Sequence, residues 1–307
     1  MDRCRFAFFT DIWRSEIQTM VSIILSLICS LSVGVLLKVA KQHKVVFMQV
    51  IGWNYLVALL LSVFAFKVSL TDVATVNFPM LLLFSLWILL PTVFLFQALS
   101  LKHVGIVKTD IAQRLSLFIP ILASYFLFGE SFSALKIIGF GLAFTAIFFT
   151  LNKSGTHNGN QKKLYYPLLV LLGFGVIDVL LKTIASAETP FTTLLFCMFA
   201  GALVIAWMIS IFQIVTKRYQ FSIRNLYWGL GLGVLNFGNV FFYLRAHKEL
   251  SDSPSTVFAT MNMGVIVFGS LIGVLFFKEK LNKHNYFGIL LALSSIVLIA
   301  LSRLYDF

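Results

Sequence analysis

Ten long apolar runs dominate this sequence and limit the folds that it can adopt. Each run has about 17 or more residues with few charges, which is enough to cross a hydrocarbon core about 30 Å thick as an α-helix. We therefore predict an all-α integral membrane protein with ten transmembrane helices, at residues 20–38, 46–66, 78–99, 109–128, 134–151, 165–186, 190–215, 226–246, 256–277 and 285–302.

The composition agrees with a membrane protein. Hydrophobic residues make up 59% of the chain and charged residues 12%, whereas about a quarter of a soluble globular domain is charged. The net charge of +12 does not indicate nucleic-acid binding, because Lys and Arg lie almost entirely between the apolar runs. Anionic lipid and the positive-inside bias select cations at those places. The expected partner of the outer surface is therefore the lipid bilayer, and no nucleic acid is expected.

The sequence offers no sign of enzyme or metal chemistry. Cys4, Cys29 and Cys197 are odd in number and widely spaced, so neither a disulfide framework nor a metal site is predicted. No HExxH, Walker A or GxSxG motif occurs, and the His residues lie at or near the ends of the apolar runs. We expect no enzyme activity, no metal and no cofactor.

One polar connection divides the chain. Residues 152–164, "NKSGTHNGNQKKL", are rich in Gly, Asn and Lys, so we interpret them as a linker between a five-helix unit at 20–151 and a second at 165–302. Residues 1–19 carry three Arg, two Asp and a Glu. Two interpretations of this extension stay open: it precedes a mature chain that starts at Met20, or it is an amphipathic interfacial helix. Residues 303–307 form a C-terminal tail.

The two units share local patterns at a nearly constant separation. "VLLK" occurs at 35–38 and at 179–182, "TVFLF" at 92–96 resembles "NVFFY" at 239–243, and Glu130 returns 149 residues later as Glu279. Five helices per unit make the second copy enter the membrane from the opposite side. We therefore predict inverted repeats, as in many secondary transporters. Glu130 and Glu279 would lie at opposite faces in short interfacial links, where turn formation and helix capping are the simplest roles.

Pro120 midway along the fourth run, "LFGE" and "IIGFGLAF" resemble the ten-helix EamA-like branch of the drug/metabolite transporter superfamily, over residues 20–302. The second unit differs, with Gly269 in place of the proline and Lys278 before its Glu. The resemblance implies a transport role and leaves the substrate open, because the family moves amino acids, sugars, nucleotide derivatives and drugs. Small four-helix relatives couple protons through a Glu in the first helix. Residues 20–38 contain no carboxylate, so that mechanism is not expected here.

Asp178 is the acidic residue nearest the centre of an apolar run. A charge at that depth costs about 3 kcal/mol unless it faces a water-filled cavity, is paired with an opposite charge, or is neutralised by protonation. Lys182 follows at the spacing that places both side chains on one helix face, so one interpretation is an internal ion pair. The other is a coupling site for a proton or cation, or a ligand for a substrate amine. Asp178 aligns with Gly34 of the first unit, so this charge breaks the symmetry of the repeat.

Further polar residues are candidates for a central site. Asp110 and Arg114 have the same four-residue spacing, and Arg114 either snorkels to the interface or binds an anionic substrate group. Gln113 and Asn262 occupy matching places in the two units. The remaining candidates are Asn236, Asn239 and Tyr243 on one helix face, Asn54 and Trp87 at mid-span, for which packing is the alternative, and Pro91 and Pro120, which should loosen their helices and could act as hinges.

These features predict a secondary active transporter that moves a small metabolite or drug-like compound across the cell (inner) membrane by alternating access. We expect a monomer or homodimer, with protons or cations as candidate coupling ions. One alternative is a carrier of a phosphorylated, nucleotide-linked or lipid-linked compound, which requires Arg114 and a Lys to face the cavity. Another is a structural membrane protein, which predicts no polar face at the midplane. The orientation stays open, since loop charges favour external termini and the family habit is cytoplasmic termini.

Overall fold

The structure is a computed structural model that describes residues 2–40, 43, 45–67, 79–104, 106–150, 165–278 and 281–304. In these residues the regular elements are helices, and none of the described segments is a strand. The helices are α1 (Asp2–Ala40), α2 (Phe47–Phe66), α4 (Met80–His103), α5 (Ile106–Leu115), α6 (Phe118–Phe126), α7 (Ala134–Thr150), α8 (Tyr165–Ala185), α9 (Phe191–Val215), α10 (Arg224–Glu249), α11 (Pro254–Phe277) and α12 (Lys283–Leu304).

Within the described residues, every predicted apolar run is helical, and the all-α fold class is confirmed there. Within the described residues, seven helices are long and apolar enough to cross a membrane, with mean hydropathy from 1.7 to 2.5. The stretches Ile111–Phe126 and Ala134–Thr150 are shorter. α10 is long but begins and ends with charged residues and is not among the seven. The chain is thus a multi-pass membrane protein, and the count of ten spans stays a prediction.

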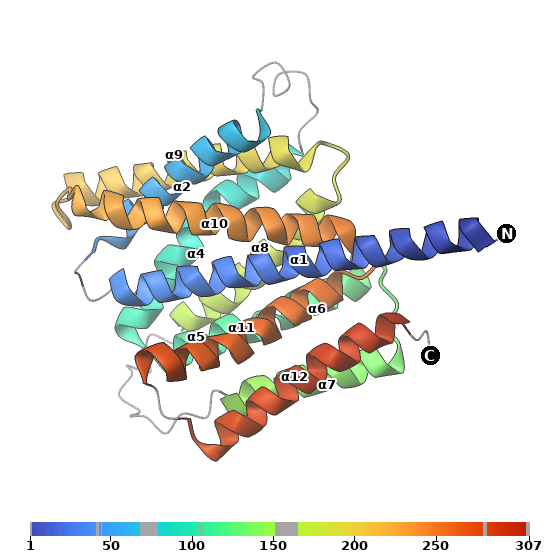
Figure 1. Cartoon of the computed structure of the whole chain (residues 1–307). Helices are drawn as coiled ribbons and strands as arrows, with labels where there is room; N and C mark the ends of the chain where they lie inside the picture. Colours follow the sequence, from blue (N-terminus) through green and yellow to red (C-terminus); the bar gives the residue numbers. More distant parts are fainter. Residues whose placement is uncertain are drawn as a thin grey trace.

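The helices lie side by side in one bundle (Figure 1). α2, α9 and α10 form one side of it, α7 and α12 the other, and α1, α4, α8 and α11 lie between them. The beginning of α1 and the end of α12 lie at the same end of the bundle, and α1 projects beyond its neighbours there. Residues 2–19 continue the first helix without interruption. Both interpretations of this extension remain predictions.

The fourth apolar run is broken into α5 and α6 near Pro120. Proline has no N–H for the carbonyl four residues before it, which here belongs to Ser116. The amide of Ile119 donates to that carbonyl instead, at 3.1 Å, and the amide of Leu117 donates to the Arg114 carbonyl at 3.3 Å. The predicted loosening is therefore confirmed at Pro120. α4 is continuous through Pro91, and α11 is continuous through Gly269, which aligns with Pro120.

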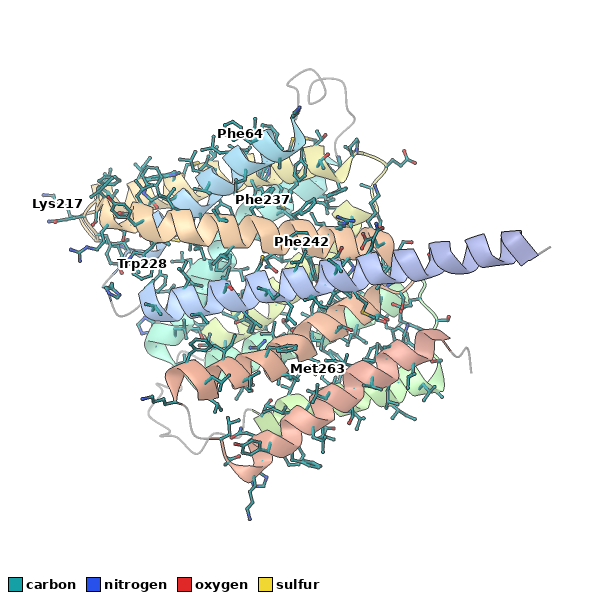
Figure 2. The ribbon with its side chains drawn as sticks, in the orientation of Figure 1. Phe64, Lys217, Trp228, Phe237, Phe242 and Met263 are labelled. Atoms are coloured by element: carbon teal, nitrogen blue, oxygen red, sulfur yellow. The ribbon has the colours of Figure 1, made fainter. Side chains whose placement is uncertain are left out.

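The outer surface is apolar, as Figure 2 illustrates with Phe64 at the end of α2. Phe64 is 76% exposed and Leu81 is 83% exposed, with many other large apolar side chains. An exposed apolar surface of this extent marks contact with another apolar phase. In the interior, glycines bring helices close together: a Cβ atom built on Gly233 would lie 2.8 Å from the carbonyl oxygen of Asn54.

Candidate functional site

A cavity of about 440 Å³ opens between helices of both halves of the chain. Its wall is formed by α1, α4 and α5 from the first half and by α8, α10 and α11 from the second. None of its lining residues comes from α2, α7, α9 or α12. The described polar side chains along the wall are Ser30, Gln97, Gln113, Arg114, Ser116, Asp178, Asn236, Asn239, Tyr243 and Asn262.

This wall unites most of the predicted site residues, although they come from four separate helices. The cavity is lined by Gln113 and Arg114 of α5, Asp178 of α8, Asn236, Asn239 and Tyr243 of α10, and Asn262 of α11. Ser30 and Gln97 were not among the predicted residues. Ser30 lies one helical turn before Gly34, on the same face of α1. Because Gly34 aligns with the predicted site residue Asp178, the repeat could have indicated that Ser30 also faces the site. Gln97 has no polar counterpart in the second half.

Asp178 is hydrogen-bonded to a hydroxyl group and not to an ammonium group. The Tyr243 hydroxyl donates to Asp178 Oδ1 at 3.0 Å, which joins α8 to α10 at the cavity wall. The described ion pairs do not include Asp178 with Lys182, so the interpretation of an internal ion pair is wrong. The four-residue spacing placed the two side chains on one face of α8, but it could not show which partner each would reach.

Lys182 instead binds the carbonyl end of α10. Its Nζ donates to the carbonyl of Ser251 at 3.2 Å and to that of His247 at 3.4 Å, and the side chain is buried, outside the cavity lining. The last carbonyls of a helix have no partner within it and carry its negative dipole end. They therefore attract a cation that lacks a closer carboxylate.

Several wall amides are held in place by hydrogen bonds. Gln97 Nε2 donates to Gln113 Oε1 at 2.8 Å, and Ser26 Oγ donates to Asn239 Oδ1 at 3.0 Å. Asn262 Nδ2 donates to the carbonyl of Phe258 at 3.0 Å. Among the described side chains, no group of three His, Cys, Asp or Glu could hold a metal ion. The wall therefore offers fixed hydrogen-bonding groups together with one carboxylate and one guanidinium.

Two predicted site residues pack away from the cavity. Trp87 donates from Nε1 to the carbonyl of Cys197 at 2.9 Å, and a Cβ atom on Gly201 would lie 2.1 Å from its ring. Trp87 thus joins α4 to α9 closely, and the packing alternative describes it. Asn54 is 1% exposed in α2 and does not belong to the cavity lining. The side chain of Asp110 lies outside the described part of the structure, so its pairing with Arg114 stays a prediction.

Glu130 is buried, whereas the sequence predicted a charge at the membrane interface, where its free-energy cost is low. Lys136 Nζ donates to it at 2.6 Å, and Ser255 donates to it from its hydroxyl at 2.6 Å and from its backbone amide at 2.9 Å. Gly129 adopts φ +65°, a left-handed conformation, two residues after the C-cap of α6 at Leu127. Glu130 therefore caps a helix, as predicted, but the helix is α11 of the other half. Glu279 lies outside the described residues, and its position stays a prediction.

Comparison with known proteins finds a family domain in the second half of the chain. The model of the "EamA-like transporter family" matches residues 162–301, which contain α8 to α11 and most of α12. Residues 162–301 thus form an EamA-like transporter family domain. An uncharacterised protein of Haemophilus influenzae is 38% identical to this EamA-like chain over 284 residues, which are 90% of this chain and 96% of the relative.

Two further similarities extend the comparison of this EamA-like chain. "Multidrug resistance protein EbrA" of Bacillus licheniformis is 37% identical over 71 residues, which are 23% of this chain and 67% of that protein. A solved structure titled "Crystal structure of protein" has a TM-score of 0.71 at 12% identity and covers 92% of this chain and 98% of its own. At this identity the match shows a shared fold. The family and the apolar helices together give a membrane transporter of small solutes.

Proposed function

We propose that this protein is a secondary transporter that moves a small polar or amphipathic solute across the cell (inner) membrane by alternating access. The observation that carries the proposal is the cavity of about 440 Å³, lined by polar side chains from both halves of the chain. A volume of this size suits a small organic molecule. A structural membrane protein has no need of such a polar wall in its interior, because each buried polar group costs free energy in lipid.

The cavity wall supports inverted repeats, with the two units contributing equivalent residues. Gln113 and Asn262, which match in the two units, both line it. On α1 and α8 the agreement extends over two turns at the separation of 144 residues that relates the two "VLLK" sequences. The equivalent lining pairs are Ser30 with Phe174, Val33 with Ile177, Gly34 with Asp178, and Leu37 with Leu181.

The helix contacts give independent support for the same arrangement. α1 packs against α10, and its equivalent α8 packs against α4, the equivalent of α10. Likewise α2 packs against α10 and α9 packs against α4, while the equivalent pairs α2 with α9 and α7 with α12 contact each other. Each contact therefore has a counterpart in which every helix is replaced by its equivalent in the other unit, as expected for two units related by a two-fold axis. Rearrangement of such units around a central site is how inverted-repeat transporters alternate access.

The charges of the wall favour a neutral or singly charged solute. Among its described lining residues, Arg114 is the single cation and Asp178 the single anion. A phosphorylated or nucleotide-linked substrate would need Lys182 as a second cation, but Lys182 binds the carbonyl groups of His247 and Ser251, at and just beyond the end of α10. Asp178 is our candidate for coupling to a proton or cation, or for binding a substrate amine. Monomer and homodimer are both compatible with this scheme.

The test is an untargeted comparison of metabolites inside and outside cells with and without the protein. We expect at least one small solute whose distribution changes. The Asn262→Trp variant should abolish this change by filling the cavity, whereas Leu271→Trp should preserve it, because Leu271 is 50% exposed on the outer surface of the same helix, α11. The proposal fails if no solute distinguishes the two cell populations under any nutrient tested.

A further inference from the structure

The equivalent positions in the two units differ in how they fill the cavity. Where α8 carries Phe174 and Asp178, α1 carries Ser30 and Gly34, and all four residues line the wall. A Cβ atom added to Gly34 would meet no atom within 4 Å. The α1 side of the cavity is therefore open where the α8 side bears an aromatic ring and a carboxylate.

We propose that the Ser30 and Gly34 face of α1 is the subsite that receives the body of the transported solute, and that Gly34 sets its upper size limit. The proposal rests on the transport function proposed above and adds a location and a size filter to it. Leu31, Val35 and Leu37 lie beside this face in the cavity lining, so an apolar or weakly polar moiety is the chemical class that fits it. The polar end of the solute would then reach the carboxylate and amides contributed by α8 and α10.

The absence of a side chain at Gly34 has no packing explanation among its described neighbours. Several other glycines of the chain are tightly enclosed: a Cβ atom on Gly173 would lie 2.4 Å from Val93, and one on Gly175 would lie 2.5 Å from Ile119. A larger residue would disrupt helix packing at those glycines. At Gly34 a larger residue would only take up cavity volume. Gly also weakens a helix relative to Ala, so the residue is unfavourable for α1 unless the space is used.

The first experiment tests the space without requiring transport. Gly34→Cys and Gly141→Cys variants of the full chain are reconstituted in liposomes and treated with the charged reagent 2-(trimethylammonium)ethyl methanethiosulfonate. Gly141 is the matched control, because it also has no atom within 4 Å of an added Cβ but lies exposed on α7, outside the cavity lining. Mass spectrometry of the labelled peptides gives the rate at each position.

Labelling at position 34 should be faster than at position 141 by on the order of tenfold, because a lipid-facing thiol stays protonated and a charged reagent does not enter lipid. Equal rates at the two positions would overturn the subsite, whatever the protein transports.

The second experiment tests size selection with the solutes that the metabolite comparison identifies. Gly34→Ala and Gly34→Leu should weaken transport of the larger solutes progressively, by about tenfold or more for Leu, and spare the smallest. Gly141→Leu should change none of them. If Gly34→Leu transports every solute as the wild type does, the subsite is wrong and the transport function stands. If the wild type moves no solute, the transport function itself has failed.

Discussion

At Asp178 the bonded partner is a neutral phenol, and this determines what the carboxyl group can do. An ammonium partner would keep the carboxyl group ionised, because protonation of the carboxylate would leave the buried ammonium without a counter-ion. The Tyr243 hydroxyl, 3.0 Å away, can donate to an ionised carboxylate and can also bond with a protonated one. Asp178 can therefore take up or release a proton beside the cavity without breaking an ion pair, which suits a coupling residue.

Asp178→Asn is expected to fold and to lose the pH dependence of transport. The amide oxygen can still accept from Tyr243, so the contact between α8 and α10 is kept while the titrating group is removed. Solute flux into liposomes, measured between pH 5.5 and 8.5, checks this; pH-dependent flux that matches the wild type would exclude Asp178 as the coupling site. Thermal unfolding of Asp178→Asn, Lys182→Gln and the double variant is the control. Their interaction energy should stay below about 0.5 kcal/mol, as for residues that do not contact each other.

Lys278→Gly is expected to raise the free energy of unfolding by about 1 kcal/mol. Lys278 is the C-cap of α11 and has φ 52°, and the aligned Gly129 lies two residues after the C-cap of α6, with φ +65°. At the aligned positions both chain segments adopt the left-handed conformation, but only the first half uses the residue that adopts it without steric cost. Thermal unfolding in detergent measures the change. Gly129→Ala is the reciprocal variant and should lower stability by a similar amount; a Lys278→Gly protein that is less stable than the wild type would contradict this account.

Among the elements, the junction of α6, α7 and α11 holds the most concentrated buried charge that the structure describes. Glu130 accepts from Lys136 of α7 and from the first turn of α11. The side chains of Lys136 and Glu130 are 7% and 2% exposed. A carboxylate at a helix N-terminus is stabilised by the free amides and by the helix dipole. Glu130 therefore ties the two halves of the chain together at one end of the bundle.

Removing one member of this pair should be far more harmful than removing both. Glu130→Ala leaves the Lys136 ammonium buried without its carboxylate, and a loss of about 3 to 5 kcal/mol is expected. The double variant Glu130→Gln with Lys136→Met removes both charges and should recover much of that loss. Thermal unfolding and the yield of monodisperse protein report the difference. Single and double variants of equal stability would show that Glu130 and Lys136 do not form an ion pair in the membrane.

At the scale of the whole molecule, both described ends of the chain lie at one end of the bundle (Figure 1). Reporter domains fused to the N-terminus and to the C-terminus should therefore lie in the same compartment. A pair of reporters that is active only in the cytoplasm or only outside it would identify that compartment and resolve the conflict between loop charges and family habit. Reporters found in opposite compartments would exclude an even number of membrane crossings.

The sequence predicts the helices and much of the cavity wall, because both depend on periodic patterns. Apolar runs locate helices, and the internal repeat relates Gln113 to Asn262 and Gly34 to Asp178. These sequence patterns could not predict the contacts that the bundle creates between segments far apart in the chain. Lys182 bonds with the carbonyls of His247 and Ser251, at and just beyond the end of α10, and Glu130 caps α11; in both cases the partners lie far away in the chain. For Trp87 both packing and the cavity stayed open, because depth in a helix does not indicate which neighbour a side chain faces.

If the two units are inverted repeats, as proposed above, the break between α5 and α6 makes this helix easier to bend in the first unit than in the second. The first unit is interrupted at Ser116 and Leu117, whereas α11 runs unbroken from Pro254 to Phe277. If each face opens by bending its own copy of this helix, the two halves of the transport cycle have unequal barriers. Influx and efflux driven by equal and opposite gradients should then proceed at different maximal rates, and the direction that requires α11 to deform should be the slower one.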